Sequence, residues 1–247
     1  MINIICVKEG DKYSADDVNR LHLMCRVHLK HHYKKSGLRF MCYTDDARGI
    51  DRDIEILPIP DKYHLGGWWD KMGIFREGLI PNPNGFKMLY LDLDTVIQQD
   101  LDSIIDTRCN TGLVGVHLYW DETTTDGNYP YKTLRYKKPF NSSVMLFYPR
   151  FCHYIWEKFW PNHNDHIFKY YGDDKFLANE IEYSTFPKGW IYSRLYGMDK
   201  DNMHNILCKV PGGSLEVAYY PEAKICLMNG PTTEHHYEDL KKYWMHT

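Results

Sequence analysis

Two aspartates separated by a single residue, Asp92 and Asp94, follow a strongly apolar run of the chain. Unpaired carboxylates are costly to bury, and a divalent cation can satisfy two of them at once. Carboxylate oxygens suit hard cations such as Mg²⁺ and Mn²⁺, which keep open positions for the oxygens of a bound phosphate. In the simpler interpretation, both aspartates only cap the turn that follows. The spacing alone fits either interpretation equally well.

The chain before this aspartate pair predicts alternating strands and helices. Residues 86–93 are nearly all apolar, as a strand buried on both faces should be. Shorter extended runs are expected at 2–7, 38–43 and 54–59. Helical character is expected after Ser14, a good N-cap residue, and across 68–78. This alternation predicts an α/β fold with a mostly parallel, Rossmann-like central sheet flanked by helices.

The position of the polar residues agrees with such a sheet. Ligands of parallel α/β sheets gather at the carboxyl ends of the strands. Thr44 and Asp45 follow one expected strand, and Asp92 and Asp94 follow another. The sequence therefore predicts a ligand site at this edge of the sheet.

The second half of the chain is less regular. Extended runs are expected within 107–116, 140–148 and 216–228. Helices are expected at 151–160 and at the end of 170–180. The polar, tyrosine-rich stretch 119–138 predicts a long loop, which is usually functional in a compact domain. No repeat or linker divides the chain, so one domain over residues 1–247 is expected.

Composition excludes some partners. Lys and Arg total 30 against 33 Asp and Glu, a net charge of -3, which favours neither nucleic acid nor an anionic membrane as partner. No apolar run is long enough for a membrane span. The seven cysteines are odd in number and widely spaced, which is typical of reduced thiols. A cytoplasmic protein is expected.

Four segments, in order, resemble glycosyltransferases of the GT-A fold, and most closely the glycogenin-like and bacterial galactosyltransferase-like group (family 8). Leu-Tyr-Leu-Asp-Leu-Asp-Thr-Val-Ile at 89–97 resembles the Asp-x-Asp segment of that group. The other three segments are Trp-Asp-Lys-Met-Gly-Ile-Phe at 69–75, Phe-Asn-Ser-Ser-Val at 140–144 and Gly-Asp-Asp-Lys-Phe-Leu at 172–177. The resemblance implies a nucleotide-binding part at about 1–105, an acceptor-side part at about 106–231 and a polar tail at 232–247.

The resemblance also assigns roles to residues. Asp92 and Asp94 would bind Mn²⁺ (or Mg²⁺), and Leu93 between them would belong to the nucleotide-contacting segment. Lys71 would contact the donor sugar or its phosphates, whereas the simpler interpretation is a solvated lysine. Catalytic or sugar-binding roles are implied for Asn141, Ser142, Asp173 and Asp174. The group has Gln where this chain has Asp174, and Gly where it has Ser143.

The chain departs from the group at the third metal ligand, which is usually a His before a late Gly. Asn229 stands there and supplies an amide oxygen, a good donor to hard cations. His235 and His236 are further alternatives. The Lys-Pro element that normally grips the diphosphate is absent, and Lys224 or Lys241 would have to replace it. The nucleobase is expected at the ends of the first two strands, at Val7, Lys8, Tyr13, Thr44 and Asp45.

The resulting hypothesis is a metal-dependent glycosyltransferase. It would move a sugar from a nucleotide-sugar, by resemblance a UDP-sugar, to a carbohydrate or other hydroxyl acceptor, with retention of anomeric configuration. Two alternatives stay open. Asp92-Leu93-Asp94 also fits a haloacid-dehalogenase-like phosphatase, in which the first Asp is a nucleophile. A binding protein with a decayed active site would explain the missing His.

Overall fold

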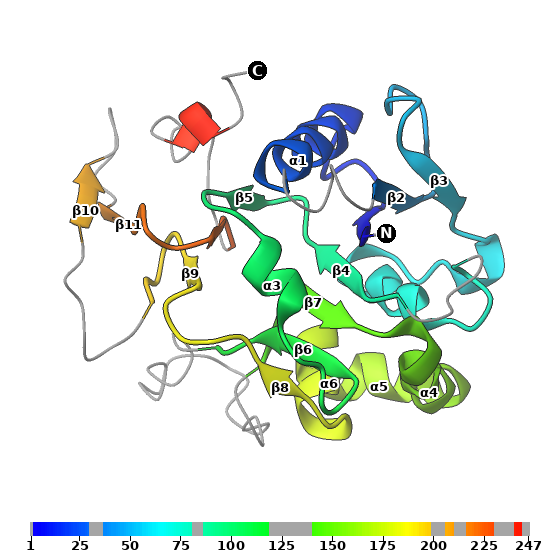
Figure 1. Ribbon diagram of the computed structural model, residues 1–247. Coiled ribbons are helices and arrows are strands. Elements are labelled where there is room, and N and C mark those ends of the chain that lie inside the picture. Colours follow the sequence, from blue (N-terminus) through cyan, green and yellow to red (C-terminus); the bar gives the residue numbers. More distant parts are fainter. Residues whose placement is uncertain are drawn as a thin grey trace.

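The computed structural model describes residues 2–29, 37–80, 86–118, 140–198, 206–209, 216–229 and 240–243, and for 206–209 and 216 the backbone only (Figure 1). Seven strands form the central sheet, in the order β3 (Glu55–Pro58), β2 (Leu38–Thr44), β1 (Ile2–Lys8), β4 (Met88–Leu91), β7 (Asn141–Phe147), β6 (Leu113–Val116) and β8 (Ser184–Thr185). Within this sheet only β7 is reversed: it pairs antiparallel with both β4 and β6, and the other neighbouring pairs are parallel. The expected α/β, mostly parallel sheet is confirmed.

Two further groups of strands lie beside the central sheet. The first is a three-stranded sheet of β5 (Thr95–Ile97), β12 (Ile225–Leu227) and β9 (Ile191–Ser193). The second is the antiparallel pair of β10 (Ile206–Lys209) and β11 (Glu216–Tyr219). Since β5 follows the aspartate pair directly, β12 brings a late part of the chain next to it.

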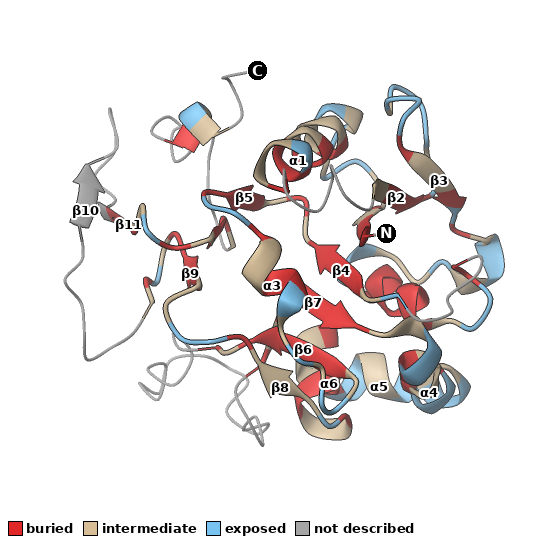
Figure 2. Ribbon diagram, viewed as in Figure 1, coloured by how far each residue is buried: buried red, intermediate tan, exposed pale blue. Residues whose placement is uncertain are grey.

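The helices cover both faces of the sheet. They are α1 (Ala15–His28), η1 (Asp61–Tyr63), η2 (Gly67–Phe75), α3 (Asp102–Asp106), α4 (Pro149–Phe159), η3 (Trp160–Asn162), α5 (His163–Tyr170) and α6 (Asp173–Glu180). Alternate residues of each strand enter opposite apolar layers, as the two-residue period of a strand requires. Thus Leu89 packs in the layer of α1, and Tyr90 packs in the layer of η2, α4 and α6. Figure 2 shows strands in the middle of the sheet, such as β4 and β7, as buried.

Local sequence explains the first helix. Ser14 is its N-cap and forms a capping box with Asp17, in which each side chain accepts from the backbone N–H of the other. Asp16 and Asp17 occupy the first turn, where acidic side chains favour the helix dipole. The helix ends at His28, before residues 30–36, which lie outside the described part.

The other expectations are met in part. The strands expected at 2–7, 38–43, 54–59, 86–93 and 140–148 are present with slightly different ends. The helix expected at 68–78 is a 3₁₀ helix, η2. The long loop expected at 119–138 lies outside the described residues. The six cysteines whose side chains are described are unbonded thiols, and five of them are buried. Among the described helices, none combines the length and apolar character that crossing a bilayer requires.

Candidate functional site

Lys71 is the centre of a buried charged cluster. Its Nζ lies 3.1 Å from Oδ1 of Asp92 and 3.3 Å from Oδ2 of Asp173, and it donates to Oγ of Ser142 over 3.0 Å. The Lys71 side chain is only 8% exposed. Burial by itself lowers the pKa of Lys71, but Asp173 and Asp92 raise it by more, so the net pKa lies above its ordinary value. Lys71 is therefore a fixed cation inside the site and not a solvated surface lysine.

The reversed direction of β7 brings these residues together. Because β7 runs against β4, the first residues of β7 lie beside the carboxyl end of β4. The backbone N–H of Asp92 donates to the carbonyl of Ser143 over 2.8 Å. Oδ1 of Asn141 accepts from the N–H of Ser143 over 3.0 Å, which shapes the start of the strand. Asn141, Ser142 and Asp92 thus share one edge of the sheet.

Asp173 and Asp174 open helix α6 on the same side. Asp173 is buried, and this burial raises its pKa, while Lys71 and Ser142 oppose the rise. Burial and the neighbouring Asp173 raise the pKa of Asp174 to about 7. The preceding Gly172 leaves room for this arrangement, since a Cβ there would lie 2.8 Å from Oδ1 of Asp174. The start of α6 therefore supplies one carboxylate that is paired with Lys71 and one whose pKa lies near neutrality.

Asp94 is half-buried beyond Asp92. Burial and the charge of Asp92 raise the pKa of Asp94 to about 6, and Lys12 and a hydrogen bond with Tyr13 oppose the rise. Leu93, between the two aspartates, is buried in the apolar layer that also holds α1, so its side chain faces away from Lys71. A buried carboxylate beside a second carboxylate is a typical arrangement for a cation site.

Asn229 lies at the end of the strand that pairs with the segment after Asp94. The N–H of Met228 donates to the carbonyl of Asp94 over 3.0 Å, which places the next residue beside the aspartate pair. Oδ1 of Asn229 accepts from Oγ of Ser193 over 2.7 Å and keeps a second lone pair. Two carboxylates and an amide oxygen would be an all-oxygen donor set, the kind that Mn²⁺ and Mg²⁺ prefer.

Lys224, one replacement considered for the missing Lys-Pro element, does not lie at this edge. Lys224 lies at the far end of the β5–β12 ladder, where its carbonyl accepts from the N–H of Gln98. Its Nζ lies 3.3 Å from the carbonyl oxygen of Asp100. Lys241 belongs to a short described segment near the C-terminus, and His235 and His236 lie outside the described residues. Lys224 is therefore held away from the aspartate pair.

The residues expected to hold a nucleobase lie at the ends of β1 and β2. Val7 and Lys8 pair with Tyr43 and Thr44 across these strands. The hydroxyl of Thr44 is tied to the backbone of Asp46, with contacts of 3.0 and 3.1 Å. Asp45 is exposed and accepts from the N–H of Gly10 over 3.2 Å. Of these expected residues, Tyr13 borders the aspartate pair, through a hydrogen bond with Asp94.

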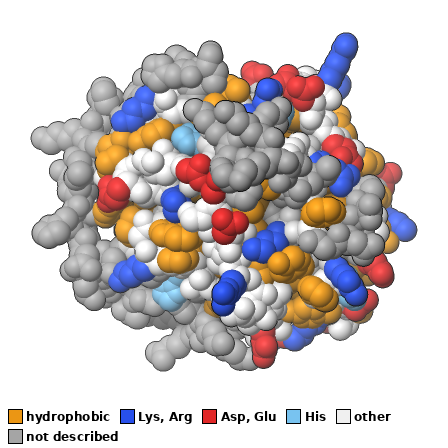
Figure 3. All heavy atoms as spheres, in the orientation of Figure 1, with side chains coloured by type: hydrophobic (Ala, Val, Ile, Leu, Met, Phe, Trp, Pro, Cys, Tyr) orange, Lys and Arg blue, Asp and Glu red, His pale blue; other side chains and the backbone are white. Residues whose placement is uncertain are grey.

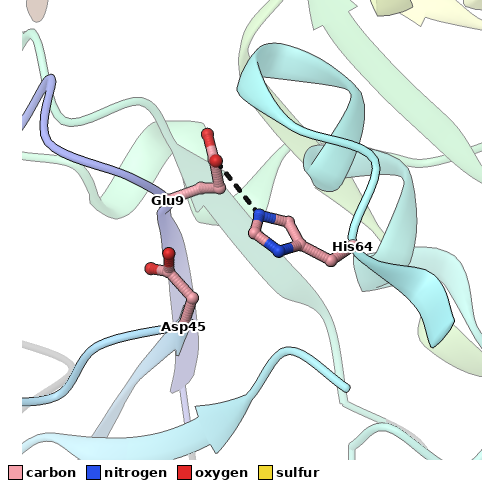
Figure 4. Close-up of side chains that lie close together, drawn as sticks. All are labelled: Glu9, Asp45 and His64. Carbon is pink, nitrogen blue, oxygen red and sulfur yellow. Dashed lines mark hydrogen bonds and ion pairs between the residues drawn. The ribbon is translucent and has the colours of Figure 1, made fainter. Parts of the chain in front are cut away.

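Glu9 and His64, which the sequence did not single out, join the same edge (Figure 4). Glu9 follows β1, and its two carboxylate oxygens contact Nε2 of His64 at 3.0 Å and the N–H of Gly67 at 2.7 Å. Among the described residues, Glu9, Asp45 and His64 form a group whose ligand atoms lie within 4.8 Å of one another. Glu9 and His64 bind each other, and Glu9 also accepts from Gly67. We therefore interpret the group as a structural contact that joins the loop after β1 to the start of η2. Because Glu9 and His64 are far apart in the sequence, no local pattern indicated that they meet.

Tyr90 is the other residue missed from the sequence. It is 1% exposed on β4, and its hydroxyl donates to Oδ1 of Asp92. Burial and Asp92 raise the pKa of Tyr90 well above its ordinary value. The two-residue period of the strand, which places positions 90 and 92 on one face, was the signal that could have identified it.

On one face of the molecule, the described side chains form no field of one charge (Figure 3). On the face drawn in Figure 3, acidic and basic side chains are interspersed among the described residues. A surface cavity of about 570 Å³ is lined by α1 and residues 51–53 and includes none of the residues of the candidate site. The chemistry-bearing cluster therefore lies elsewhere, at the carboxyl ends of the strands.

Solved structures of glycosyltransferases share this fold. The galactosyltransferase LgtC, solved with donor and acceptor sugar analogs, has a TM-score of 0.63 and 13% identity, covering 98% of this chain and 94% of LgtC. A glycosyltransferase involved in the glycosylation of the major capsid of PBCV-1 has a TM-score of 0.53 and 13% identity. The match covers 98% of this chain and 100% of that glycosyltransferase. The bifunctional WbbM has a TM-score of 0.57 and 14% identity, covering 100% of this chain and 50% of WbbM. No protein-family model and no curated protein matches the sequence. The chain has the GT-A fold.

Proposed function

We propose that this chain is a metal-dependent glycosyltransferase. It moves a sugar from a nucleotide-sugar, with a UDP-sugar as the donor, to a hydroxyl of a carbohydrate or other acceptor. The observation that supports this most is the buried contact of Lys71 with Asp92, Asp173 and Ser142 at the carboxyl ends of the strands. The glycosyltransferases with the same fold support the reaction class.

A divalent cation, Mn²⁺ or Mg²⁺, would be held by Asp92, Asp94 and Asn229. When bound, it supplies Lewis-acid stabilisation of the diphosphate leaving group. The two aspartates supply the negative charge that holds it, and Asn229 adds a neutral oxygen. The raised pKa of Asp94 fits this role, because a cation would favour its ionised form.

The chain's own side chains position the sugar. Lys71 presents a fixed positive charge on the floor of the site, where it would stabilise charge that develops on the departing diphosphate. Asp173, oriented by Lys71 and Ser142, offers carboxylate oxygens to sugar hydroxyls. Asp174 has a pKa of about 7 and can accept or donate a proton near neutral pH. Retention of anomeric configuration is part of the proposal, and NMR of the first-formed product would test it.

The test is donor hydrolysis with a panel of UDP-sugars, with and without Mn²⁺, followed by transfer to simple glycosides. Wild-type protein should release UDP from at least one donor only when Mn²⁺ is present. Asp92→Asn and Asp94→Asn should each lower the rate about 100-fold or more. Asp106→Asn, an exposed aspartate on α3, is the matched control and should leave the rate unchanged.

The same assays separate the alternatives. Tight binding of UDP and Mn²⁺ by calorimetry without hydrolysis or transfer would favour a binding protein. Phosphatase activity on small phosphoesters without nucleotide-sugar turnover would favour the dehalogenase-like enzyme. The GT-A fold disfavours this last alternative, since the aspartate pair here follows β4 and not the first strand.

A further inference from the structure

Tyr90 links the two oppositely charged residues at the centre of the site. Its side chain is 1% exposed and lies in the apolar layer that contains η2. A buried tyrosine hydroxyl usually finds a hydrogen-bond partner. Here the partner is not a backbone carbonyl but Oδ1 of Asp92.

The ring of Tyr90 makes a second contact. Nζ of Lys71 lies 5.2 Å from the ring centroid, within the range of a cation–π interaction. Tyr90 therefore donates a hydrogen bond to the anion and presents its π face to the cation. No other side chain in the described part of the site is recorded in contact with both Lys71 and Asp92 in this way.

The contacts leave the two oxygens of Asp92 unequal. Oδ1 accepts from the Tyr90 hydroxyl and lies 3.1 Å from Nζ of Lys71, whereas Oδ2 accepts one long hydrogen bond, of 3.4 Å, from the same nitrogen. The backbone of Asp92 is fixed as well, by its N–H bond of 2.8 Å to Ser143. The carboxylate is thus held mainly through Oδ1, which has two close contacts, whereas Oδ2 has only the long hydrogen bond from Lys71.

We propose that Tyr90 is a positioning residue, whose hydroxyl orients the carboxylate of Asp92 so that Oδ2 can bind a divalent cation. This inference rests on the proposed function, because it assumes that Asp92 is a metal ligand. Partners that orient a ligand in this way typically contribute about 10–100-fold to metal affinity or activity. Tyr90 would act through Asp92 and would not touch the substrate.

The test is the affinity of the protein for Mn²⁺ alone, measured by titration calorimetry and by electron paramagnetic resonance of free Mn²⁺. Tyr90→Phe removes the hydroxyl and keeps the ring beside Lys71, so the fold should persist. We expect the Kd for Mn²⁺ to rise about tenfold or more. A thermal melt without metal checks that the variant is folded.

Tyr43→Phe is the matched control. Tyr43 is fully buried on β2 in the same apolar layer, and no hydrogen-bond partner for its hydroxyl is found among the described residues. Removing that hydroxyl should leave the Kd for Mn²⁺ unchanged. A double variant adds a second readout: in the Asp92→Asn background, Tyr90→Phe should cause little further loss of affinity.

The outcomes distinguish this inference from the function on which it rests. Wild-type protein that binds no Mn²⁺ at millimolar concentration, with or without UDP, would overturn both. If wild-type binds Mn²⁺ and Asp92→Asn does not, equal affinity of wild-type and Tyr90→Phe would overturn the role of Tyr90 alone. An equal loss in Tyr43→Phe would also overturn it, since any buried hydroxyl would then have the same effect.

Discussion

The ammonium of Lys71 lies 3.3 Å from Oδ2 of Asp173, and both side chains are almost fully buried, with 8% and 5% exposed. One residue comes from η2 and the other begins α6, so the pair ties together two elements that are distant in the sequence. Removing one partner of a buried pair leaves an unpaired charge in the interior. The stability of the site and its proposed chemistry therefore depend on the same contact.

Lys71→Met should lower the free energy of unfolding by about 3–5 kcal/mol at pH 7.5, because Asp173 and Asp92 lose their cation. Adding Asp173→Asn should recover part of this loss, since one of the stranded charges is then removed. Urea unfolding of the two single variants and the double variant measures both effects. Lys62→Met, on exposed η1, is the control. A Lys71→Met protein as stable as wild-type would contradict the buried pairing.

Gly73→Ala should destabilise the protein by overpacking. A Cβ at position 73 would lie 2.6 Å from Cε1 of Tyr43, which is closer than real contacts allow. Forced contacts of this kind cost about 1–3 kcal/mol. In the Tyr43→Leu background the same substitution should cost much less, since the obstructing ring is gone. Urea unfolding of all four proteins tests this; an equal cost in both backgrounds would show that the ring is not the cause.

His64 should make stability depend on pH. Its hydrogen bond with Glu9 raises its pKa, and Asp70 and Asp45, which face it from η2 and from the end of β2, add to the rise. A raised folded-state pKa stabilises the protein below the unfolded pKa of about 6.5, and this stabilisation disappears as the pH rises through the folded-state pKa. His64→Gln should therefore lower the free energy of unfolding more at pH 5.5 than at pH 8.5.

The control for this trend is His153→Gln. His153 lies on α4, and its Nδ1 is 3.0 Å from the carbonyl oxygen of Arg150, with no carboxylate recorded within ion-pair distance among the described residues. The difference between the two variants across the pH range isolates the effect of Glu9 and Asp70. A larger loss for His64→Gln at pH 8.5 than at pH 5.5 would contradict the assignment.

Glu180 should show the opposite pH dependence. A hydrogen bond from Tyr170 and the nearby Lys158 lower its pKa to about 2. A lowered folded-state pKa stabilises the protein above the unfolded value of about 4.3, and this stabilisation is lost as the pH falls towards 2. Glu180→Gln should lower the free energy of unfolding by about 1–3 kcal/mol at pH 7, and by less at pH 3. The control is Glu157→Gln. Glu157 is exposed and lies on α4, the helix that also carries Lys158, so this substitution should have little effect on the free energy of unfolding at either pH.

The sequence predicted the edge of the sheet but not everything that gathers there. Asp92 and Asp94 were placed correctly after a strand, because an apolar run followed by carboxylates is a local pattern. The position of Asn141 beside Asp92 depends on the reversal of β7, which no residue within 140–148 encodes. In the sequence, only the resemblance to a known family indicated that Asn141 and Asp92 belong to the same site.

Apart from the local contact of Tyr90 with Asp92, the contacts that sequence reasoning missed join distant segments. Glu9 and His64 meet only because the chain returns from η1 to the end of β1. Lys224 was a reasonable substitute by charge, yet the register of β5 with β12 directs it away from Asp94. Local patterns predict strands and their ends, whereas strand order and register decide which ends meet.

The pairing of β12 with β5 has a consequence for the synthesis of the protein. β12 delivers Asn229 to the segment that follows Asp94, through the bond of 3.0 Å from the N–H of Met228. During translation the aspartates leave the ribosome well before this partner strand has been made. Contacts between such distant segments form slowly. Under the proposed function, a nascent chain would lack the third proposed metal ligand, and it would acquire transfer activity only after residue 229 has emerged.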